Sequence, residues 1–298
     1  MDYDAEEVLQ GVSLRWPSFL NVPPSQGKLE DCLLWVIPVP YDSTASFQPG
    51  ARFGPSAIIQ ASHELEDWDE LLSKDSSLVG ISTLPALEPI VDAPSKFLDV
   101  LSDVVSIAMK HEKLPVLLGG EHSITIGSVR AIADKFPGVQ VIYLDAHADF
   151  RDSYMGSRFG HASVAKRLSE FTEVVHVGVR SISECELADI PDYSRTFFEA
   201  PREGIFDQNT LGKILSVLGE NVYITVDLDV LDPSLMPSVG NPQPGGLSWN
   251  GINELLRVIT SRCRVVGFDV VELAPNLGYP HASFTAAKLV YRLMGYVT

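Results

Sequence analysis

Val-Ile-Tyr-Leu-Asp-Ala-His-Ala-Asp, residues 141 to 149, joins an apolar run to three titratable side chains. The run at 141–144 is typical of a strand buried on both faces of a parallel sheet. Asp145, His147 and Asp149 follow at every second position. Because residues two apart on a strand project to the same side, a backbone that stays extended would gather these groups at the carboxyl end of the strand. Open parallel sheets bind ligands there, and a metal ion is the simplest partner for such a set.

A single Asp–His pair at a strand end is equally typical of a solvated polar turn, so the metal hypothesis depends on further clusters. A second apolar run, 223–226, ends in Asp227 and Asp229, and a third, 115–118, leads into Gly-Gly-Glu-His-Ser at 119–123. The three strand ends offer four carboxylates and two imidazoles, about what two divalent ions require. This mixed set suits Mn²⁺ and leaves Zn, Fe and Ni open. The lack of thiolate ligands argues against a structural zinc site.

The composition is that of a globular protein. Of 298 residues, 45% are hydrophobic and 9% aromatic, which is enough for a large core. The net charge of −17 argues against a nucleic-acid partner, because phosphate binding requires a basic face, and it favours the approach of a cationic substrate. The three scattered cysteines are typical of reduced cytoplasmic thiols. An acidic amino terminus and the absence of long apolar runs predict a cytoplasmic protein that does not cross a membrane.

The rest of the chain alternates between strand-like and helix-like segments. Residues 1–30 are polar and contain Pro17, Pro23 and Pro24, so we expect an arm on the surface or on a neighbouring subunit. Residues 31–298 show neither a composition break nor a repeat, which predicts one domain. About eight strands separated by helices predict a mostly parallel sheet covered on both faces. We expect strands at 33–39, 79–82, 115–118, from 141, 173–179, 195–198, 222–229 and 264–269, and helices at 55–63, 95–110, 125–136, from 162 to about 171, 208–218, 249–261 and 283–293.

Several motifs occur in a fixed order. They are Ser-Phe-Gln-Pro-Gly-Ala-Arg-Phe-Gly-Pro (46–55), Gly-Gly-Glu-His-Ser (119–123), Asp-Ala-His-Ala-Asp (145–149), Asp-Leu-Asp-Val-Leu-Asp-Pro-Ser (227–234), Pro-Gly-Gly-Leu-Ser (244–248) and Val-Glu-Leu-Ala-Pro (271–275). Together they resemble the ureohydrolases, the family of arginases and agmatinases, from about residue 33 to the end. The resemblance implies a three-layer α/β/α fold, a pair of Mn²⁺ ions, hydrolysis of a guanidinium group to release urea, and a homotrimer or homohexamer.

The resemblance also implies a ligand set. One ion would be held by His122, Asp145, Asp149 and Asp227, and the other by Asp145, His147, Asp227 and Asp229. Asp145 and Asp227 would then bridge the two ions. Guanidinium is a poor electrophile, and a metal pair lowers the pKa of a shared water toward about 7, which makes that water a strong nucleophile.

Three residues receive catalytic roles from the resemblance. Glu272 lies in the guanidinium-binding motif of the family, and a carboxylate can take guanidinium bidentately. His161 lies where the family has a histidine that moves protons to the leaving amine or from solvent. Asp149 would also hydrogen-bond the attacking hydroxide. The alternatives are a surface glutamate for Glu272 and a structural histidine for His161. Asp232 and Asp269 are expected to orient ligands or fix turns.

The segment 151–160 bears on the substrate. Arginases recognise the amino-acid head group with a Ser/Thr/Asn-rich stretch ending in His-Gly, whereas His161 is followed by Ala162. We therefore expect an agmatinase-like enzyme that converts the dication agmatine to putrescine and urea. Guanidinobutyrate, guanidinopropionate, guanidine and arginine are the alternative substrates. Asn-Pro-Gln at 241–243 departs from the common Thr-Pro-Glu of agmatinases, and Arg158 would favour a guanidino acid if it lined the pocket.

Two other classes of protein share parts of this pattern. Zinc-dependent deacetylases of acetylated amines have the same fold but hold one catalytic metal with fewer ligands. The presence of both His122 and His147 argues against them. A catalytically inactive assembly protein would have lost a ligand or Glu272, and the chain retains all of these residues.

Overall fold

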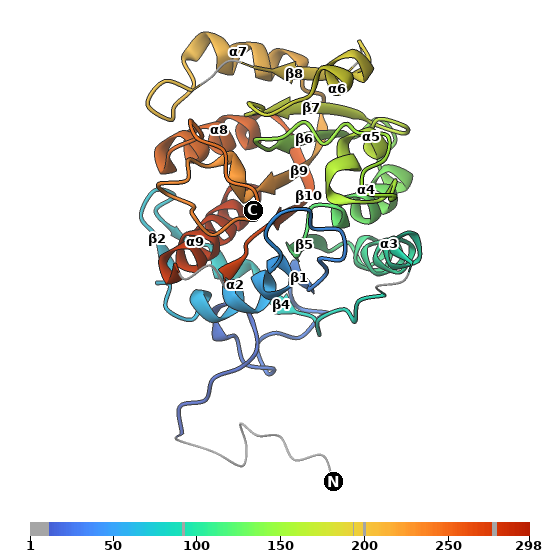
Figure 1. Cartoon of the computed structure of the whole chain (residues 1–298). Coiled ribbons are helices and arrows are strands. Elements are labelled where there is room, and N and C mark those ends of the chain that lie inside the picture. Colours follow the sequence, from blue (N-terminus) through green and yellow to red (C-terminus); the bar gives the residue numbers. More distant parts are fainter. Residues whose placement is uncertain (1–11, 91–92, 193, 199–200, 276–278) are drawn as a thin grey trace.

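The computed structural model describes residues 12–90, 93–192, 194–198, 201–275 and 279–298. The main strands are β1 (Leu34–Val39), β4 (Ile81–Thr83), β5 (Leu114–Gly119), β6 (Gln140–Leu144), β7 (Glu173–Val177), β8 (Arg195–Phe197), β9 (Asn221–Asp227) and β10 (Arg264–Val271). They form one eight-stranded sheet in the order β4-β1-β5-β10-β9-β6-β7-β8 (Figure 1). Every neighbouring pair in it is parallel.

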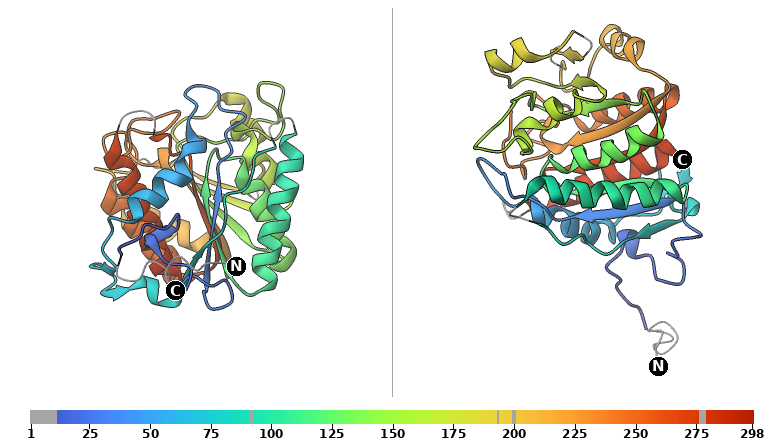
Figure 2. Two further views of the ribbon diagram at one scale, coloured as in Figure 1. Left: turned by 90° about the horizontal axis from the view of Figure 1, so that it is seen from below. Right: turned by 90° about the vertical axis from the view of Figure 1, so that its right-hand side faces the viewer.

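Helices lie on both faces of this sheet. One face is covered by α2 (Gly54–Ser62), α7 (Gln208–Val217), α8 (Trp249–Arg262) and α9 (Pro280–Val297), and the other by α3 (Pro94–Lys110), α4 (Ile124–Lys135) and α5 (Val164–Leu168). Figure 2 shows the sheet between the two helix layers, each of which packs its own hydrophobic core. None of the helices in the described ranges is long and apolar enough to cross a membrane.

Smaller elements complete the fold. A short helix, α6 (Glu184–Asp189), follows β7, and a capping box between Ser183 and Glu186 begins it. The hairpin of β2 (Trp68–Asp69) and β3 (Lys74–Asp75) is attached to α9, because Arg292 donates to Asp69 at 2.8 Å.

The apolar patterns explain why this sheet is buried. All six residues of β1 are buried, as parallel strands with helices on both faces require. In α3, by contrast, Phe97, Leu98, Leu101 and Val105 form one buried face at helical spacing. The three-layer α/β/α fold with its eight-stranded parallel sheet is confirmed.

The expected strands and helices are all present, with ends that differ by a few residues. One expectation about the backbone is wrong: the chain does not stay extended to Asp149. β6 ends at Leu144, and Asp149 has φ of +48°, in the left-handed region. The regular pairing of β6 with β7 and β9 also stops at Leu144, and an isolated parallel bridge between His147 and Ser181 follows it.

The described part of the expected arm, residues 12–30, lies against the sheet edge. Phe19 is fully buried, and its backbone N–H donates to Thr83 Oγ1 at 2.9 Å. Ser82 Oγ donates to Gly27 O at 2.7 Å. These contacts attach the segment to the edge strand β4 and protect that edge. Residues 1–11 lie outside the described residues, and the division into an arm and one catalytic domain stays a prediction.

Candidate metal centre

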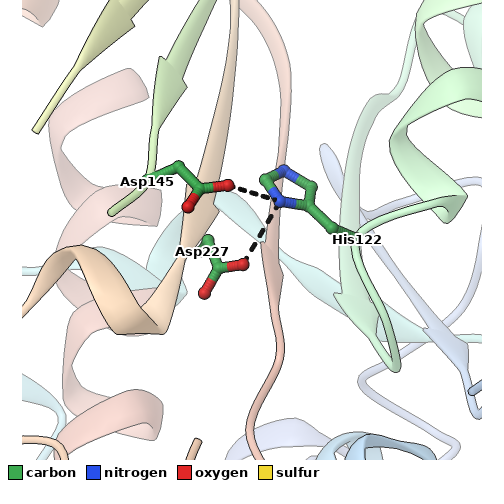
Figure 3. A group of neighbouring side chains, drawn as sticks. All are labelled: His122, Asp145 and Asp227. Carbon is green, nitrogen blue, oxygen red and sulfur yellow. Dashed lines mark ion pairs between the residues drawn. The ribbon is translucent and has the colours of Figure 1, made fainter. Parts of the chain in front are cut away.

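The carboxyl ends of three central strands bring the separate motifs together. His122 lies just after β5, Asp145 directly follows β6, and Asp227 is the last residue of β9. Figure 3 shows the three side chains pointing toward one another from different strand ends. His122 Nδ1 lies 3.0 Å from Asp145 Oδ2 and 3.3 Å from Asp227 Oδ2. These residues form a first group that can hold a metal ion.

A second group shares Asp145 with the first. His147 Nδ1 lies 2.8 Å from Asp229 Oδ2 and 3.5 Å from Asp145 Oδ1. The possible ligand atoms within each group lie within 4.8 Å of one another. Asp145 thus directs one oxygen toward each histidine, which is the arrangement that a bridging carboxylate needs.

Asp149, the remaining predicted ligand, approaches the first group from the loop after β6. Its Oδ2 accepts a hydrogen bond from Tyr143 OH at 2.8 Å and lies 3.6 Å from His122 Nδ1. Its φ of +48° is uncommon for a residue other than glycine, although aspartate adopts it more readily than most. A left-handed turn, and not strand alternation, therefore places this carboxylate.

Local turns organise both acidic motifs. Asp145 Oδ1 accepts from His147 N at 2.5 Å, and Asp227 Oδ1 accepts from Asp229 N at 2.8 Å. The first aspartate of each motif thereby holds the backbone that carries the next ligand. An aspartate that caps the N–H two residues later is a turn signature, so the spacing itself offered this signal.

The contacts behind His122 determine which ring nitrogen faces the carboxylates. Thr225 Oγ1 donates its hydrogen to Asp269, so toward His122 Nε2, at 2.8 Å, it acts as an acceptor. Nε2 therefore carries the ring hydrogen, and Nδ1 directs its lone pair at the carboxylate oxygens. A histidine that binds a metal is typically backed by a carboxylate in this way. Asp269 thus lies where an orienting residue was expected, and Asp232 fixes a turn by accepting from Ser234 N at 3.0 Å.

The charge in this centre fits a metal pair. Asp145 Oδ2 is buried and accepts no hydrogen bond. Burial, followed by the charges of neighbouring aspartates, raises the pKa of Asp149, Asp227 and Asp229. Burial acts against a charged His147, but Asp145 and Asp229 outweigh it and raise the pKa of His147 to about 12. A bound cation would offset this negative charge, and the mixed oxygen and nitrogen donors suit Mn²⁺ and similar ions.

Glu272 lies one residue past β10, beside the first group. Its Oε1 accepts from His122 N at 2.7 Å, and its own N–H donates to Gly120 O at 2.9 Å. Its φ of +68° is a strained value for glutamate, of the kind that clusters at functional sites. Burial, followed by the charge of Glu121, raises the pKa of Glu272 to about 8.

A cavity of about 300 Å³ lies over these groups. It is lined by the expected ligands His147, Asp149, Asp227 and Asp229 and by the two expected catalytic residues His161 and Glu272. Glu272 therefore faces the cavity and not the outer surface. A concave site with convergent polar groups is the usual place for a small substrate.

His161 begins the short helix η4 (His161–Ser163) and lines the cavity. Its backbone N–H donates to Thr44 Oγ1 at 3.0 Å, and its ring Nε2 lies 3.0 Å from Ser46 Oγ. Burial, with a smaller contribution from the nearby His147, lowers the pKa of His161 to about 4. The ring is therefore neutral at pH 7 and able to accept a proton.

The cation that lines the cavity is Arg151, not Arg158. Arg158 is exposed and pairs with Asp152 at 3.1 Å. Arg151 Nη2 lies 3.7 Å from Glu186 Oε2, and its guanidinium lies 4.9 Å from the centre of the Tyr154 ring. Sequence reasoning missed both members of this pair, because only the fold brings the start of α6 beside the loop after β6.

The Asn-Pro-Gln segment at 241–243, which departs from the common Thr-Pro-Glu of agmatinases, lies against the outer side of His147. Asn241 Nδ2 is 3.1 Å and Gln243 Nε2 is 3.5 Å from His147 Nε2. Either amide can turn its oxygen toward this nitrogen and accept its hydrogen. Arg180 holds this loop near the centre, because it donates to Gln243 O and to Asp229 O, each at 2.7 Å.

Comparisons with known proteins identify similar sequences and a similar structure. A model of the Arginase family matches residues 33–295. N(1)-aminopropylagmatine ureohydrolase from a strain of Thermus thermophilus is 41% identical over 273 residues, which are 89% of this chain and 90% of that protein. Agmatinase of Pyrococcus horikoshii is 36% identical over 273 residues, 90% of this chain and 93% of that protein. The crystal structure of agmatine ureohydrolase of Thermoplasma volcanium has a TM-score of 0.83 and 31% identity, covering 98% of this chain and 97% of that chain.

Proposed function

The chain belongs to the arginase family of ureohydrolases, and from this premise we propose that it hydrolyses agmatine to putrescine and urea with two Mn²⁺ ions. One observation carries the proposal. Glu272, a carboxylate suited to a guanidinium, shares a cavity with members of both groups that can hold a metal ion: Asp227 of the first, and His147 and Asp229 of the second. The cavity thus offers a place for the reacting group and a place for the ions side by side.

We assign the ions to the six residues named by the sequence motifs. Asp145 supports a bridging role because its two oxygens face different histidines. Asp149 and Asp227 complete the surroundings of His122 Nδ1, and Asp229 faces His147 Nδ1. Two divalent ions bound here would lower the pKa of a shared water molecule and supply a nucleophile near neutral pH.

Glu272 binds and orients the guanidinium in this proposal. The hydrogen bond from His122 N holds one carboxylate oxygen, so the side chain is fixed before the substrate arrives. A bidentate contact between carboxylate and guanidinium aligns the planar group and presents its carbon for attack. Such preorganisation makes the attack effectively unimolecular.

His161 and Asp149 handle protons in this proposal. The neutral ring of His161 can accept a proton at the nitrogen that faces the cavity and pass it to the leaving amine. Asp149 lines the same cavity, and its carboxylate can accept a hydrogen bond from the attacking water. Protonation of the amine is required because an amide anion is a very poor leaving group.

Three observations favour agmatine over arginine. Residues 151–160 lack the head-group pattern of arginases, and the net charge of −17 attracts a dication. At the tail end, Arg151 and Glu186 form a pair of opposite charge, and the ammonium of agmatine can replace the half-exposed Arg151 beside Glu186.

A panel of guanidines tests this substrate assignment. We expect the Mn²⁺-loaded protein to release urea from agmatine with a higher kcat/KM than from arginine, guanidinobutyrate, guanidinopropionate or guanidine. Equal or faster release from any of these competitors would overturn the assignment. Glu272→Gln keeps the size of the side chain but removes its charge, and we expect it to raise KM and lower kcat without changing the metal content.

N1-aminopropylagmatine is a second candidate substrate. The Thermus protein named for it is 41% identical to this chain, compared with 36% for the Pyrococcus agmatinase. The two compounds share the guanidinium and differ in the chain attached to it, and Arg151 lines the same cavity as Glu272. The ratio of kcat/KM for the two compounds decides between them.

We further propose a homotrimer or homohexamer in the cytoplasm. Sedimentation of the purified protein should give three or six times the chain mass of 32.6 kDa. Chelation followed by loading with Mn²⁺, Ni²⁺, Fe²⁺ or Zn²⁺ should give the highest activity with Mn²⁺. Fractionation of the source cells tests the location.

A further inference from the structure

Glu121 has no role in the reaction proposed above, although it precedes His122 in the Gly-Gly-Glu-His-Ser motif. Its side chain is fully buried. Its Oε2 accepts from Thr44 N at 2.7 Å, and its Oε1 accepts from Thr44 Oγ1 at 2.7 Å and from Ser123 Oγ at 2.5 Å. In its ionised form the carboxylate can only accept, so both hydroxyls donate to it, as the backbone N–H does. Two of these three bonds hold Thr44.

Thr44 connects this carboxylate to His161. The backbone N–H of His161 donates to Thr44 Oγ1 at 3.0 Å, and His161 Nδ1 lies 3.3 Å from the same oxygen. A hydroxyl has one hydrogen, and Thr44 donates it to Glu121. Toward His161, Thr44 Oγ1 can therefore only accept, so Nδ1 must carry the hydrogen of the neutral ring.

The other ring nitrogen, Nε2, then carries the lone pair that can accept a proton. His161 Nε2 lies 3.0 Å from Ser46 Oγ, and both residues line the cavity over the metal groups. The nitrogen able to accept a proton is thus the one directed toward the substrate site. The opposite tautomer would leave Thr44 Oγ1 facing a second acceptor and would put the ring hydrogen on the cavity side.

Close packing holds the loop of Thr44 against the motif of Glu121. Glu121 N donates to Tyr41 O at 2.7 Å, and Gly120 N donates to Val39 O at 3.0 Å. A Cβ atom on Gly120 would lie 1.8 Å from Tyr41 O, so only glycine permits this approach. Thr44 is therefore fixed by backbone contacts as well as by the carboxylate.

We propose that Glu121, acting through Thr44, is a positioning residue that fixes the tautomer and the orientation of His161. The effect on catalysis rests on the proposed function, because it requires His161 to carry the proton. The tautomer itself does not depend on that function. A buried carboxylate that orients a base through an intermediate group follows the same logic as other hydrogen-bonded catalytic relays.

The test uses the ring nitrogens of His161 in the Zn²⁺-loaded full-length protein, since Zn²⁺ is diamagnetic. Long-range ¹⁵N–¹H correlation spectra of ¹⁵N-histidine-labelled protein distinguish the two tautomers, and His161→Asn identifies the resonances. In the wild type we expect hydrogen on Nδ1. Thr44→Val removes the hydroxyl at nearly constant volume and should shift the population to the other tautomer. Thr44→Ser keeps the hydroxyl and should restore the wild-type spectrum.

Kinetics of the Mn²⁺-loaded protein provide the second readout. We expect Thr44→Val to lower kcat about 10- to 100-fold, part of what a general acid or base contributes, with KM changed less than about threefold. Thr260→Val is the matched control, because Thr260 Oγ1 donates to Leu256 O on α8, outside the cavity lining, and should behave as the wild type. Glu121→Gln should act in the same direction as Thr44→Val. Should Glu121→Gln fail to fold, Thr44→Val and Thr44→Ser decide.

An unchanged His161 tautomer in Thr44→Val would overturn the inference, and so would a changed tautomer with unaltered kcat. A wild-type protein that releases no urea from any guanidine would refute the proposed function. The tautomer spectra would still decide whether Glu121 and Thr44 fix the ring.

Discussion

The two halves of the candidate metal centre hold the same kinds of ligand in different surroundings. The inner half comprises His122, Asp227 and the shared Asp145, and the outer half comprises His147, Asp229 and Asp145. The side chain of His122 is 1% exposed, whereas that of His147 is 17% exposed. The inner half is therefore enclosed by the core, and the outer half forms part of the cavity wall.

The groups behind the two histidines also differ. The His122 ring donates to Thr225, which donates to the buried carboxylate of Asp269. The other ring nitrogen of His147, Nε2, faces the amides of Asn241 and Gln243. Thr225 and Asp269 belong to central strands, while residues 241–243 belong to a loop. Two histidines that look alike in the sequence are thus backed by groups that differ in rigidity and charge. Substitutions in the two halves should therefore have unequal effects.

The largest effect should come from Asp145, the residue that both halves share. Asp145→Ala removes an oxygen from each group, so we expect neither ion to be retained and urea release to fall to background. His122→Ala and His147→Ala should each lose one ion, which metal analysis of the purified proteins would show. Retention of both ions by Asp145→Ala would contradict the bridging role proposed for Asp145.

The next effect concerns His176, a buried histidine in the packing behind the inner half. The Tyr143 ring stacks on His122 at 4.4 Å, and the buried His176 lies 5.2 Å from Tyr143. Burial lowers the pKa of His176 to about 4 from its ordinary value of 6.5. Between pH 4 and pH 6.5, the His176 ring binds a proton in the unfolded chain but not in the folded chain. The contribution to stability is therefore complete above pH 6.5 and is lost as the pH falls to 4, on the order of 3 kcal/mol in all.

Urea unfolding of metal-free protein between pH 4 and 7 measures this contribution. His176→Leu cannot take up the proton, so its free energy of unfolding should fall less steeply with decreasing pH than that of the wild type. Parallel curves for the two proteins would show that His176 does not titrate in this way.

A smaller effect should follow removal of the charge behind His122. Asp269 accepts hydrogen bonds from Thr125 at 2.8 Å and from Tyr223 at 2.7 Å in addition to Thr225. Asp269→Asn replaces one acceptor oxygen by an NH₂ group that faces these donors. We expect metal affinity of the inner half to fall about 10- to 100-fold, the usual effect of changing a group behind a metal ligand. Competition with a fluorescent chelator measures it.

The smallest effect should come from the outer half. Asn241 lies on an exposed loop, so water can replace its amide beside His147 in Asn241→Ala. We expect the free energy of unfolding to change by less than about 0.5 kcal/mol, as for other surface substitutions. Metal affinity should change less than in Asp269→Asn. A loss as large as that of Asp269→Asn would remove the distinction between the two halves.

Much of this centre could be predicted from sequence because its residues lie at the ends of apolar runs. Asp145 follows one apolar strand and Asp227 ends another, and parallel strands place their carboxyl ends at one edge. The same argument was wrong about the backbone of Asp149. Strand alternation needs a neighbouring strand to continue it, and the pairing of β6 with β7 and β9 stops at Leu144.

Other features could not be predicted, because they depend on contacts between distant segments. Arg151 lines the cavity while Arg158 does not, and nothing in the local sequence distinguishes the two arginines. Thr44 meets Glu121 and His161 only because the loop after β1 folds over the carboxyl edge of the sheet. Side-chain direction in an irregular loop is decided by what packs around it.

By itself the sequence determined the fold class and named the candidate ligands, because apolar periodicity and acidic motifs are local and survive without any knowledge of packing. Only the tertiary structure decided which oxygens face which histidine, which ring nitrogens carry a lone pair, and which arginine lines the cavity. Those depend on distances between atoms far apart in the chain, and a hydrogen bond or a metal ligand is gained or lost within less than an ångström.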